Sequence, residues 1–444
     1  MNPTAALDSP VLFHPASSPD YVPREPLRTL QSQRLRQVVA QAYEHVPLFR
    51  QRMQKHGLTP ADVRGVDDIH TLPFTSQGDL GDTYPLGMLA VPMQQVLRLH
   101  VAGGASGKPI VAAYTQRDLE VWAQVVIRSL VSCGIREGDV IYGACGYDLF
   151  LDGRGLDDAA ATLKATVIPG CGGDAARQLM IIKDYGVSAI CCTPNHFLCL
   201  IERAEKLDVD LRELPLRVGI FVAEPWSEAL RQRIEASAGI KAYDVYGLAE
   251  IVGPSVGAEC WHQDGVHIFE DHFFPEIVDP ATGDPLPDGQ EGELVLTMLS
   301  REAMPMIRYR TRDVTAILAE PCPCGRTMRR IRRVSRHREE MLVVRGVNVL
   351  PAEIEAALLA VAGTLPRYQI VLTQQQGGDQ LEVQVEVTPQ VFSDRVGALE
   401  ALQSKLTREI EHRLGLGVAV RLVEPHSIDR GQGKAQRVVD QRGT

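Results

Sequence analysis

The residues best suited to chemistry form a glycine-rich stretch from Arg98 to Pro109, with the sequence Arg-Leu-His-Val-Ala-Gly-Gly-Ala-Ser-Gly-Lys-Pro. Three of the five residues from 103 to 107 are glycine, and glycine lets neighbouring backbone N–H groups converge on an anion. Lys108 adds a positive charge beside them. The stretch is not a Walker P-loop, because Ala102 and Pro109 stand where that motif has glycine and a hydroxyl residue. From composition alone, a phosphate cradle and a solvated turn with a surface lysine are equally compatible with it.

Cysteine supplies the second group of reactive side chains. The chain has nine cysteines, an odd number without the spacing of a disulfide framework, which indicates a reducing compartment. Cys191 and Cys192 lie in an apolar run and are predicted to be buried strand residues. Cys322 and Cys324 differ, because they lie in the stiff sequence Pro-Cys-Pro-Cys-Gly, where burial in a core does not explain two thiols.

The composition limits the classes of protein to consider. With 444 residues the chain is longer than one core usually supports, so two or three domains are expected. The net charge of -10 argues against sequence-independent binding to nucleic acid, which depends on surplus lysine and arginine. No apolar run approaches the ~20 residues of a membrane span, and the first residues lack the pattern of a signal peptide. A cytoplasmic protein is therefore predicted.

The elements that must position these groups alternate in type along the chain. A helical pattern covers residues 27–57, and from about 91 to 250 short β-rich runs alternate with helical stretches. This alternation predicts a parallel or mixed sheet with helices on its faces, and ligands usually bind at the carboxyl ends of such strands. The predicted strands are 140–142, 165–168, 189–192, 218–222 and 242–246, and the predicted helices are 117–133, 175–185 and 227–237.

Two further segments follow. Strand-like runs at 274–279 and 291–297 predict a β subdomain within about 260–335. Beyond it, a compact α+β module has predicted strands at 341–344, 368–372, 381–387 and 418–423 and helices at 351–362 and 395–414. The predicted fold class is thus α/β: a large N-terminal domain, residues 1–335, of sheets flanked by helices, and a small C-terminal α+β domain, residues 341–444.

Seven stretches together resemble the phenylacetate–coenzyme A ligase family of adenylate-forming (AMP-binding) enzymes, and the resemblance extends from about Leu27 to Arg442. They are Arg98–Pro109, Phe221-Val-Ala-Glu-Pro-Trp226, Asp244-Val-Tyr-Gly-Leu-Ala-Glu250, Tyr309-Arg-Thr-Arg-Asp313, Pro321-Cys-Pro-Cys-Gly325, Val344-Arg-Gly-Val-Asn-Val-Leu-Pro351 and Gly433-Lys-Ala-Gln-Arg437. The resemblance implies the adenylate-forming enzyme fold and an ATP-dependent aryl–coenzyme A ligase. An aromatic carboxylate would attack the α-phosphorus of ATP to give an acyl adenylate, and coenzyme A would then displace AMP.

The resemblance also implies roles for individual residues. Lys434 would offset the charge that develops between carboxylate and α-phosphate, and Asp313 would accept hydrogen bonds from the ribose hydroxyls. Glu250 would be catalytic as a ligand of Mg²⁺, which prefers oxygen donors. The alternatives are a solvated lysine, an ion pair of Asp313 with Arg310 or Arg312, and a helix cap. Further ATP or AMP contacts are expected at Ser106, Gly107, Lys108, Ala223, Glu224, Pro225, Gly247 and Tyr246, the last stacking on adenine unless it is a core aromatic.

A zinc site is implied by the same resemblance. Cys260, His267, Cys322 and Cys324 would form a closed Cys3His site, which is typical of structural zinc. His262 competes with His267 for the fourth position, and His267 is preferred because it matches the histidine after glycine in the family. The alternative is a set of reduced thiols without a metal.

The chain departs from the family pattern in three places. Where the family has Ser-Ser-Gly-Thr-Thr-Gly-Lys, residues 102–108 keep only Ser106 among the hydroxyls. Each lost bond to phosphate could cost on the order of 1.5–3 kcal/mol. An alternative function is therefore an acyltransferase or acyl-binding relative that uses ATP poorly. The hinge between domains, residues 336–340, also differs from the family, and its candidate pivots are Glu339 and Glu340.

The third departure concerns the pocket for the aromatic acid, where Asp148 and Asp152 replace glycines of the family pattern. A carboxylate beside the ring would favour an acid that carries an amino or hydroxyl group, unless both side chains face solvent. The predicted pocket residues are Tyr147, Asp148, Phe150, Ala223, Ile251 and Pro254. The expected partners are small molecules (the acid, ATP and coenzyme A), and the resemblance is compatible with a homodimer.

Overall fold

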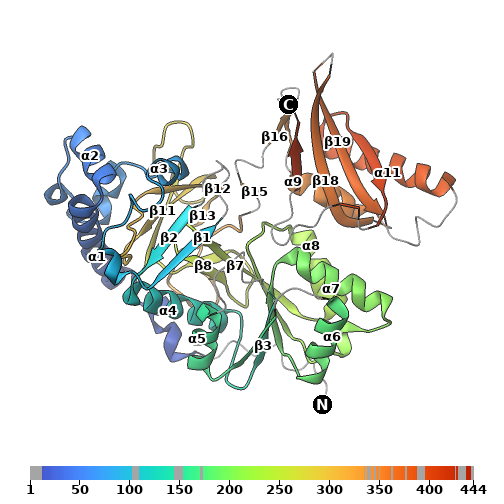
Figure 1. The fold of residues 1–444 in the computed structure, drawn as a ribbon, viewed down its shortest axis with the longest axis horizontal. Helices are drawn as coiled ribbons and strands as arrows, with labels where there is room; N and C mark the ends of the chain where they lie inside the picture. The colour runs from blue at the N-terminus through green and yellow to red at the C-terminus, as the bar shows by residue number, and fades with distance from the viewer. Residues whose placement is uncertain are drawn as a thin grey trace. The chain divides into compact units, whose positions relative to one another are not determined.

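The computed structural model describes residues 13–102, 110–144, 154–170, 174–334, 336–337, 342–344, 347–349, 351–361, 364–375, 378–387, 396–425, 427–428 and 437–441. The chain divides into two compact units (Figure 1). The N-terminal unit comprises residues 1–223 and 237–334, and the C-terminal unit comprises residues 224–236 and 335–444. Within the described residues, no helix is both long and apolar enough to cross a membrane.

The N-terminal unit is organised around a mixed sheet with the strand order β13-β14-β9-β8-β7-β6-β5-β3-β4 among the described residues. The parallel part contains β3 (Val140–Gly143), β4 (Thr166–Pro169), β5 (Ala189–Cys192), β6 (Val218–Val222) and β7 (Lys241–Leu248). The antiparallel part contains β8 (Gly253–Glu259), β9 (Val266–Ile268), β13 (Ile317–Leu318) and β14 (Arg330–Ile331). Every residue of β6 is buried, as expected for a strand in the middle of a parallel sheet.

A second, antiparallel sheet contains β10 (Phe273–Val278), β11 (Gly292–Met298) and β12 (Tyr309–Thr315). Residues 260–335 therefore supply strands to both sheets, because β9, β13 and β14 extend the first sheet beyond β8. A separate hairpin pairs β1 (Arg98–Ala102) with β2 (Ile110–Tyr114), so that β1 lies at the start of the glycine-rich stretch and β2 directly follows it.

Helices cover these sheets. Their bounds are α1 (Arg24–His45), α2 (Pro47–Lys55), α3 (Gln77–Asp82), α4 (Gln116–Ser132), α5 (Arg154–Leu163), α6 (Ala175–Asp184) and α7 (Pro194–Lys206). Helix α8 (Glu228–Ala238) follows β6 in the sequence, and its residues up to 236 belong to the C-terminal unit. Helix α4 contacts α5 and β8, and α6 contacts α7. The single helical pattern predicted over residues 27–57 is interrupted at Val46, because Pro47 has no N–H to continue α1 and instead begins α2.

Short 3₁₀ turns connect the larger elements: η2 (Pro15–Tyr21), η3 (Pro60–Asp62), η4 (Val66–Thr71), η5 (Met93–Gln95) and η6 (Leu211–Glu213).

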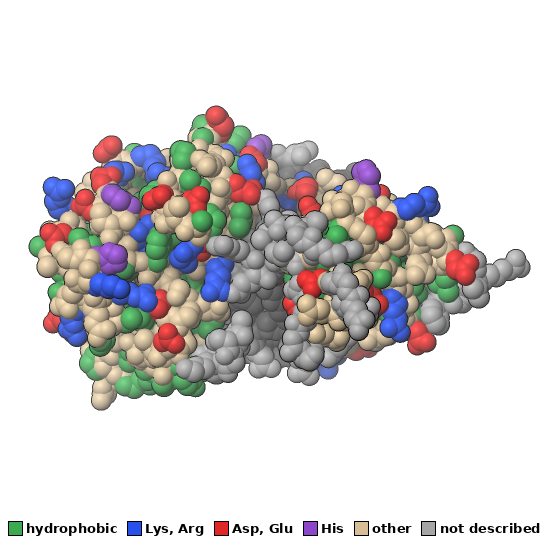
Figure 2. Space-filling view, turned by 90° about the horizontal axis from the view of Figure 1, so that it is seen from above, with side chains coloured by type: hydrophobic (Ala, Val, Ile, Leu, Met, Phe, Trp, Pro, Cys, Tyr) green, Lys and Arg blue, Asp and Glu red, His purple; other side chains and the backbone are tan. Residues whose placement is uncertain are grey.

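On the face seen in Figure 2, acidic and basic side chains are interspersed over the described surface rather than gathered by sign.

A buried ion-pair network holds η2 against the body of the N-terminal unit. Arg128 of α4 is 2% exposed. Its Nε donates to Asp20 Oδ1 at 2.7 Å, and its Nη1 donates to Asp271 Oδ1 at 2.9 Å. Arg326 reaches the other oxygen of Asp20 at 3.1 Å. The Arg128 guanidinium also stacks over the Phe269 ring, 4.3 Å from its centroid. Each buried charge therefore has an opposite charge in direct contact, which the low dielectric of the interior requires.

The C-terminal unit contains the predicted α+β module. Its sheet has the described order β20-β19-β18-β21, built from β18 (Thr364–Gln375), β19 (Gly378–Val387), β20 (Ala419–Val423) and β21 (Val438–Asp440). Strands β15 (Arg336–His337), β16 (Leu342–Val344) and β17 (Val347–Val349) precede it, and β16 pairs with β17. Helices α9 (Pro351–Ala360) and α11 (Val396–Leu414) contact each other and the sheet, and enclose a separate apolar core.

An ion pair with a buried carboxylate lies inside the C-terminal unit, three residues after Lys434 in the sequence. Glu355 of α9 is 1% exposed, and its Oε2 lies 2.9 Å from Nη2 of Arg437. The Arg437 guanidinium also lies over the Tyr368 ring, 5.5 Å from its centroid. These contacts fix the start of β21 against α9 and β18, three residues after Lys434.

The predicted α/β class, with a small α+β module at the C-terminus, is confirmed.

Candidate functional site

Two of the predicted site segments follow neighbouring parallel strands of the first sheet. Ala223 follows β6, and Glu250 lies in the turn after β7. Because β6 and β7 are paired in parallel, these segments leave the sheet at the same edge, where open α/β sheets usually bind ligands. Ala223 has φ of 77°, in the left-handed region that costs a non-glycine residue about 1–2 kcal/mol. Such strain is concentrated at functional sites.

The turn that carries Glu250 is shaped by an irregularity between β7 and β8. Tyr246 pairs with Gly257 and Leu248 pairs with Gly253, so the register shifts at Gly247. On the facing strand Ser255 has φ of 81°. A bulge of this kind bends the strand and redirects the side chains beside it. The bulge therefore sets the direction in which the chain leaves β7 towards Glu250.

A second segment with the same kind of irregularity carries Asp313. Burial alternates along β12, so Tyr309, Thr311 and Asp313 share the buried face of the strand. The β11–β12 register shifts opposite Glu293 and Val295, and Arg312 has φ of 64° within the shifted part. The unusual backbone lies directly beside the predicted ribose-binding carboxylate. The ion pair of Arg310 is made with Glu293 rather than with Asp313.

Tyr246 and Asp313 connect the two segments. The Tyr246 hydroxyl donates a hydrogen bond to Asp313 Oδ2 at 2.5 Å, although the residues belong to different sheets. Asp313 is buried, at 5% exposure, while the Tyr246 ring is half-buried. Burial of the hydroxyl and the adjacent carboxylate raise the pKa of Tyr246 well above its usual value. The phenol therefore stays protonated and acts as a donor at neutral pH.

Tyr309 lies near the other carboxylate. It belongs to β12 and is 3% exposed. Burial and the nearby Glu250 carboxylate raise the pKa of Tyr309 well above its usual value, so this phenol stays protonated at neutral pH. Sequence reasoning assigned no role to Tyr309. The signal that could have found it is a repeated spacing, in which a tyrosine precedes a carboxylate by four residues in both segments.

The remaining predicted residues differ in position. Glu224 is buried and Pro225 is half-buried, and both follow Ala223 directly. Ile251 is completely buried in the core of the N-terminal unit, whereas Pro254 is a half-buried residue of β8. The other predicted site residues lie outside the described residues: Ser106, Gly107, Lys108, Tyr147, Asp148, Phe150, Glu339, Glu340 and Lys434.

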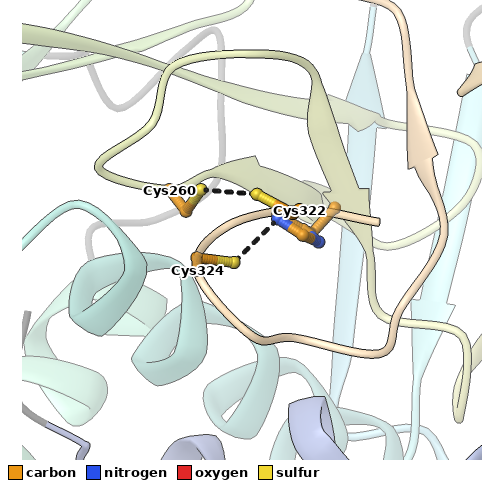
Figure 3. Close-up of side chains that lie close together, drawn as sticks. Cys260, Cys322 and Cys324 are labelled. Atoms are coloured by element: carbon orange, nitrogen blue, oxygen red, sulfur yellow. Dashed lines mark hydrogen bonds between the residues drawn. The ribbon is translucent and has the colours of Figure 1, made fainter. Parts of the chain in front are cut away.

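The predicted metal ligands form a second cluster. Cys260 follows β8, His267 belongs to β9, and Cys322 and Cys324 lie in the turn between β13 and β14. Figure 3 shows the three thiols converging, and the ligand atoms of all four residues lie within 4.8 Å of one another. Of the two candidate histidines, His267 belongs to this cluster and His262 does not.

The spacing of the ligand atoms fits a tetrahedral ion. Cys260 Sγ lies 3.6 Å from Cys322 Sγ, and Cys324 Sγ lies 3.4 Å from His267 Nε2. A tetrahedral zinc ion with Zn–S bonds of about 2.3 Å separates two sulfurs by about 3.8 Å, and a sulfur from an imidazole nitrogen by about 3.6 Å. Disulfide bonding is excluded at these sites, because S–S bonds are about 2.05 Å long.

The surroundings favour deprotonation of Cys324, whereas hydrogen bonds to Cys322 and Cys324 raise the pKa of Cys260. Hydrogen bonds from Cys260 and Cys322, together with His267, hold the pKa of Cys324 far below its usual value. The other imidazole nitrogen of His267, Nδ1, lies 3.3 Å from the Met328 carbonyl oxygen. A carbonyl at this position fixes the tautomer that presents Nε2 to an ion, as in many metal sites. These four residues could therefore hold a metal ion.

Comparison with protein-family models gives two matches. Residues 160–299 match the model described as AMP-binding enzyme, and residues 346–442 match the AMP-binding enzyme C-terminal domain. The first match includes Glu250 and both the β6 and β7 edges, and the second includes Lys434 and most of the C-terminal unit.

Similar proteins with curated descriptions are phenylacetate–coenzyme A ligases. The protein of Thermus thermophilus is 43% identical over 435 residues, which is 95% of this chain and 98% of the relative. The protein of Escherichia coli K12 is 43% identical over 418 residues, which is 94% of this chain and 95% of the relative. Both comparisons cover the two units of the chain.

Solved structures show the same architecture. A 2-hydroxyisobutyryl-CoA ligase in the postadenylation state, in complex with R3-HIB-AMP, has a TM-score of 0.88 at 29% identity, covering 97% of this chain and 94% of the other. An anthranilate CoA ligase in complex with anthranoyl-AMP has a TM-score of 0.60 at 17% identity, covering 77% of this chain and 66% of the other. The second likeness concerns the fold alone.

Proposed function

Because this chain belongs to the phenylacetate–coenzyme A ligase family of adenylate-forming enzymes, we propose that it is an ATP-dependent aryl–coenzyme A ligase. It activates an aromatic carboxylic acid as an acyl adenylate and transfers the acyl group to coenzyme A. The observation that carries the proposal is the position of two carboxylates at the strand edge of the N-terminal unit: Asp313 accepts a hydrogen bond from Tyr246, and Glu250 lies near Tyr309. That arrangement presents acidic groups suited to a nucleotide and its metal in a chain that matches AMP-binding enzymes.

In the first step, a carboxylate oxygen of the acid attacks the α-phosphorus of ATP and pyrophosphate leaves. Asp313 accepts hydrogen bonds from the ribose hydroxyls and so fixes the nucleotide relative to the acid. Glu250 would hold Mg²⁺, an ion that neutralises phosphate charge when bound. Lys434 supplies the positive charge that stabilises the transition state at the α-phosphate.

Further nucleotide contacts belong to the same proposal. The backbone near Ala223, Glu224 and Pro225, with Gly247 and the half-buried Tyr246 ring, would border the adenine. Ser106, Gly107 and Lys108 would contact the phosphates.

In the second step, the coenzyme A thiol attacks the acyl carbonyl carbon of the adenylate. The bond between that carbon and the phosphate oxygen breaks, and AMP leaves with the electron pair. The hinge at residues 336–340 would let the C-terminal domain turn between the steps.

The alternative function, a relative that kept the fold but uses ATP poorly, rests on the missing hydroxyls of residues 102–108. The comparisons support the ligase and give no support to this alternative, because the similar full-length proteins are ligases. Among those hydroxyl positions only Ser106 is retained. The alternative would become the better explanation only if nucleotide bound without turnover.

The test is release of pyrophosphate that depends on the added acid, measured across a panel of aromatic acids. The panel should include phenylacetate and its amino- and hydroxy-substituted analogues, because Asp148 is expected to favour a hydrogen-bond donor on the ring. The wild type should release pyrophosphate and form the acyl–coenzyme A ester, and Lys434→Ala should lower the rate of adenylation about 100-fold or more. A wild type that releases no pyrophosphate with any acid would falsify the proposal.

We also propose that Cys260, His267, Cys322 and Cys324 bind a structural zinc ion. The support is the spacing of their ligand atoms and their closed set of four donors. Elemental analysis should find about one zinc per chain, and Cys322→Ser should remove it. Cys199→Ser, a change outside the cluster, should leave the zinc content unchanged.

The setting of the enzyme is part of the proposal. A reducing, cytoplasmic environment is supported by the described cysteines, among which there is no disulfide bond. A homodimer is testable by light scattering of the purified protein.

A further inference from the structure

From the contacts of the β1–β2 hairpin, we infer that Arg301 is a positioning residue for the phosphates of ATP. It holds the hairpin that borders the glycine-rich stretch against the turn that carries Glu250, and so sets the spacing of two segments proposed to contact the phosphates and their metal. Arg301 acts through Ala113 and Tyr114 of β2 rather than by contact with ATP. The inference rests on the proposed function and gives a task to a side chain that has none in it.

The first argument is the pair of contacts that Arg301 makes with β2. Arg301 lies shortly after β11 and is 3% exposed. Its Nη2 donates a hydrogen bond to the Ala113 carbonyl oxygen at 2.6 Å, and its guanidinium lies over the Tyr114 ring, 4.0 Å from the centroid. A planar cation that donates to the backbone and also stacks on the next side chain restrains both the position and the tilt of the strand. Arg301 therefore anchors the end of β2.

A buried carboxylate supports the same anchor. Asp118, near the start of α4, accepts hydrogen bonds from backbone N–H groups at 3.0, 2.8 and 2.9 Å, those of Thr115, Glu302 and Ala303. Its Oδ2 also lies 3.8 Å from Arg301 Nε. The segment of Arg301 is thereby tied to the residue that follows β2, and the buried cation has an opposite charge beside it.

The second argument is the link from β2 to the turn after β7. Tyr114 is completely buried, and its hydroxyl donates a long hydrogen bond to the Val252 carbonyl oxygen, at 3.4 Å. Val252 belongs to the same turn as Glu250. Because Arg301 stacks on the Tyr114 ring, a shift of the arginine would move the hydroxyl relative to this turn. Tyr114 therefore connects the hairpin directly to the turn of Glu250.

Aromatic contacts extend the anchor to β1. The Trp122 ring of α4 stacks on the Tyr114 ring, with centroids 5.7 Å apart. The Arg98 guanidinium lies over Trp122 at 5.9 Å, and the His100 ring lies 5.0 Å from the Tyr114 ring. Arg98 and His100 are alternate residues of β1, so they share one face of that strand. Both strands of the hairpin are thus packed against one group of rings, which Arg301 also contacts.

The third argument is energetic. Burial of an arginine costs desolvation, and Arg301 recovers only part of that cost, because its Nη1 has no hydrogen-bond partner within the described part of the chain. An apolar side chain of similar volume is often as stable at such a position. Stability alone therefore does not account for an arginine here, whereas control over the position of the hairpin does.

The binding arm of the test uses calorimetry on the full-length protein with Mg²⁺ and two nucleotides, the α,β-methylene analogue of ATP and AMP. Arg301→Met removes the guanidinium and keeps an unbranched side chain, while Asp118 keeps its backbone donors. The variant should bind the ATP analogue about 10-fold more weakly and AMP as the wild type does, because AMP lacks the β- and γ-phosphates. Unchanged affinity for the analogue, or an equal loss for both nucleotides, would overturn the assignment.

The kinetic arm separates the two steps of the reaction. Arg301→Met should raise the KM for ATP in acid-dependent pyrophosphate release about 10-fold. The same variant should form the coenzyme A ester from preformed acyl adenylate at the wild-type rate, since that step involves no β- or γ-phosphate. Equal slowing of both steps would show that Arg301 only stabilises the fold.

Tyr114→Phe provides a second variant that keeps the ring and removes only the hydroxyl. It should raise the KM for ATP about 2–3-fold and leave the second step unchanged, since one long hydrogen bond is lost. This variant carries the test if Arg301→Met does not fold. Wild-type kinetics in Tyr114→Phe would overturn the link through Val252.

Arg308→Met is the matched control. Arg308 is also 3% exposed, donates to backbone carbonyl groups, and lies over an aromatic ring, that of Phe74, at 4.0 Å. Its described side-chain contacts are with residues 70–74 and Glu276 rather than with the hairpin. It should lower stability yet keep the ratio of the two nucleotide affinities at the wild-type value. Thermal melts of all variants set a measuring temperature at which each is folded.

The outcomes separate the two levels of the proposal. A wild type that binds the ATP analogue and releases pyrophosphate, with an Arg301→Met variant indistinguishable from it, overturns only this inference. A wild type that does neither overturns the proposed function itself.

Discussion

Gly247 lies so close to the backbone of Gly253 that a β-carbon added to Gly247 would stand 2.1 Å from the Gly253 carbonyl oxygen. The same β-carbon would lie 2.6 Å from the α-carbon of Pro254. Both contacts are with backbone, which cannot rotate away as a side chain can. Residue 247 must therefore be glycine if β7 and β8 are to keep their register. The same glycine preserves the position of the turn that carries Glu250.

Gly247→Ala should destabilise the protein by about 1–3 kcal/mol, because the facing strand must shift to relieve the overlap. It should also raise the Mg²⁺ requirement for pyrophosphate release, since Glu250 moves with the turn. Urea unfolding and a Mg²⁺ titration measure the two effects. Gly78→Ala in α3, where the added β-carbon would meet only Ser76 Oγ at 3.6 Å, is the control and should leave both unchanged or slightly increase stability.

Arg128→Ala should lower the free energy of unfolding by about 3–5 kcal/mol, because it leaves the carboxylates of Asp20 and Asp271 buried without their shared cation. Chemical denaturation measures this loss. Arg212→Ala removes an exposed ion pair with Asp210 and should leave the free energy of unfolding almost unchanged. Similar losses for the two variants would show that the buried network contributes little to stability.

Stability should fall as the pH falls from neutrality. Burial lowers the pKa of His272, against the attraction of Asp271. Burial would raise the pKa of Asp271, but His272 and Arg128 outweigh it and hold that pKa well below its usual value. Both groups bind fewer protons in the folded state than in the unfolded state, so stability is lost below about pH 6.5 through His272 and below about pH 4 through Asp271.

Urea unfolding between pH 4 and pH 8 tests this dependence, with His272→Gln as the comparison. The wild type should lose stability between pH 6.5 and pH 4, and the variant should show a shallower slope over that interval. Identical slopes would mean that other groups govern the acid sensitivity.

Removal of metal should lower the melting temperature of the protein. If free zinc is present at about 1,000 times the dissociation constant of the Cys3His cluster, binding stabilises the folded protein by about 4 kcal/mol. This stabilisation corresponds to a rise in melting temperature of roughly 8 °C for a unit of this size. Incubation with a strong chelator should produce this shift in the wild type and none in Cys322→Ser, which already lacks the metal. A wild-type melting temperature insensitive to the chelator would contradict a structural role for zinc.

Arg437→Ala should destabilise the C-terminal unit, because Glu355 is then buried without its cation. It should also slow adenylation several-fold, since Arg437 anchors the chain three residues after Lys434. Hydrogen exchange at β21 and acid-dependent pyrophosphate release measure the two effects. Arg413→Ala, which removes an exposed pair with Glu409 at 2.9 Å on α11, should change neither.

Local patterns predicted most of the elements. The strand expected at residues 189–192 coincides with β5, and the helix expected at 117–133 differs from α4 by one residue at each end. These segments succeed because hydrophobic periodicity is a property of neighbouring residues. The sequence also brought together Cys260, His267, Cys322 and Cys324, although only through likeness to a family, and the structure places the four in one cluster.

Contacts between distant segments were harder to predict. Nothing in the periodicity of residues 260–335 says which strands join which sheet, because strand pairing is decided by tertiary packing. The contact between Tyr246 and Asp313 was missed for the same reason, since it joins residues 67 positions apart. The left-handed backbone of Arg312 was also unexpected, because arginine gives no local signal for it.

The position of the Cys3His cluster along the chain affects the order of events during synthesis. Cys260 and Cys322 are 62 residues apart, so a metal that joins them closes a loop containing β10, β11 and β12. Such a cross-link removes chain entropy worth about 4 kcal/mol from the unfolded state. The last ligand, Cys324, leaves the ribosome after the whole of β12 and before any residue of the C-terminal unit beyond 334. Metal binding could therefore close this loop on the growing chain. The strand that carries Asp313 would then be held in place before the residues that carry Lys434 have been synthesised.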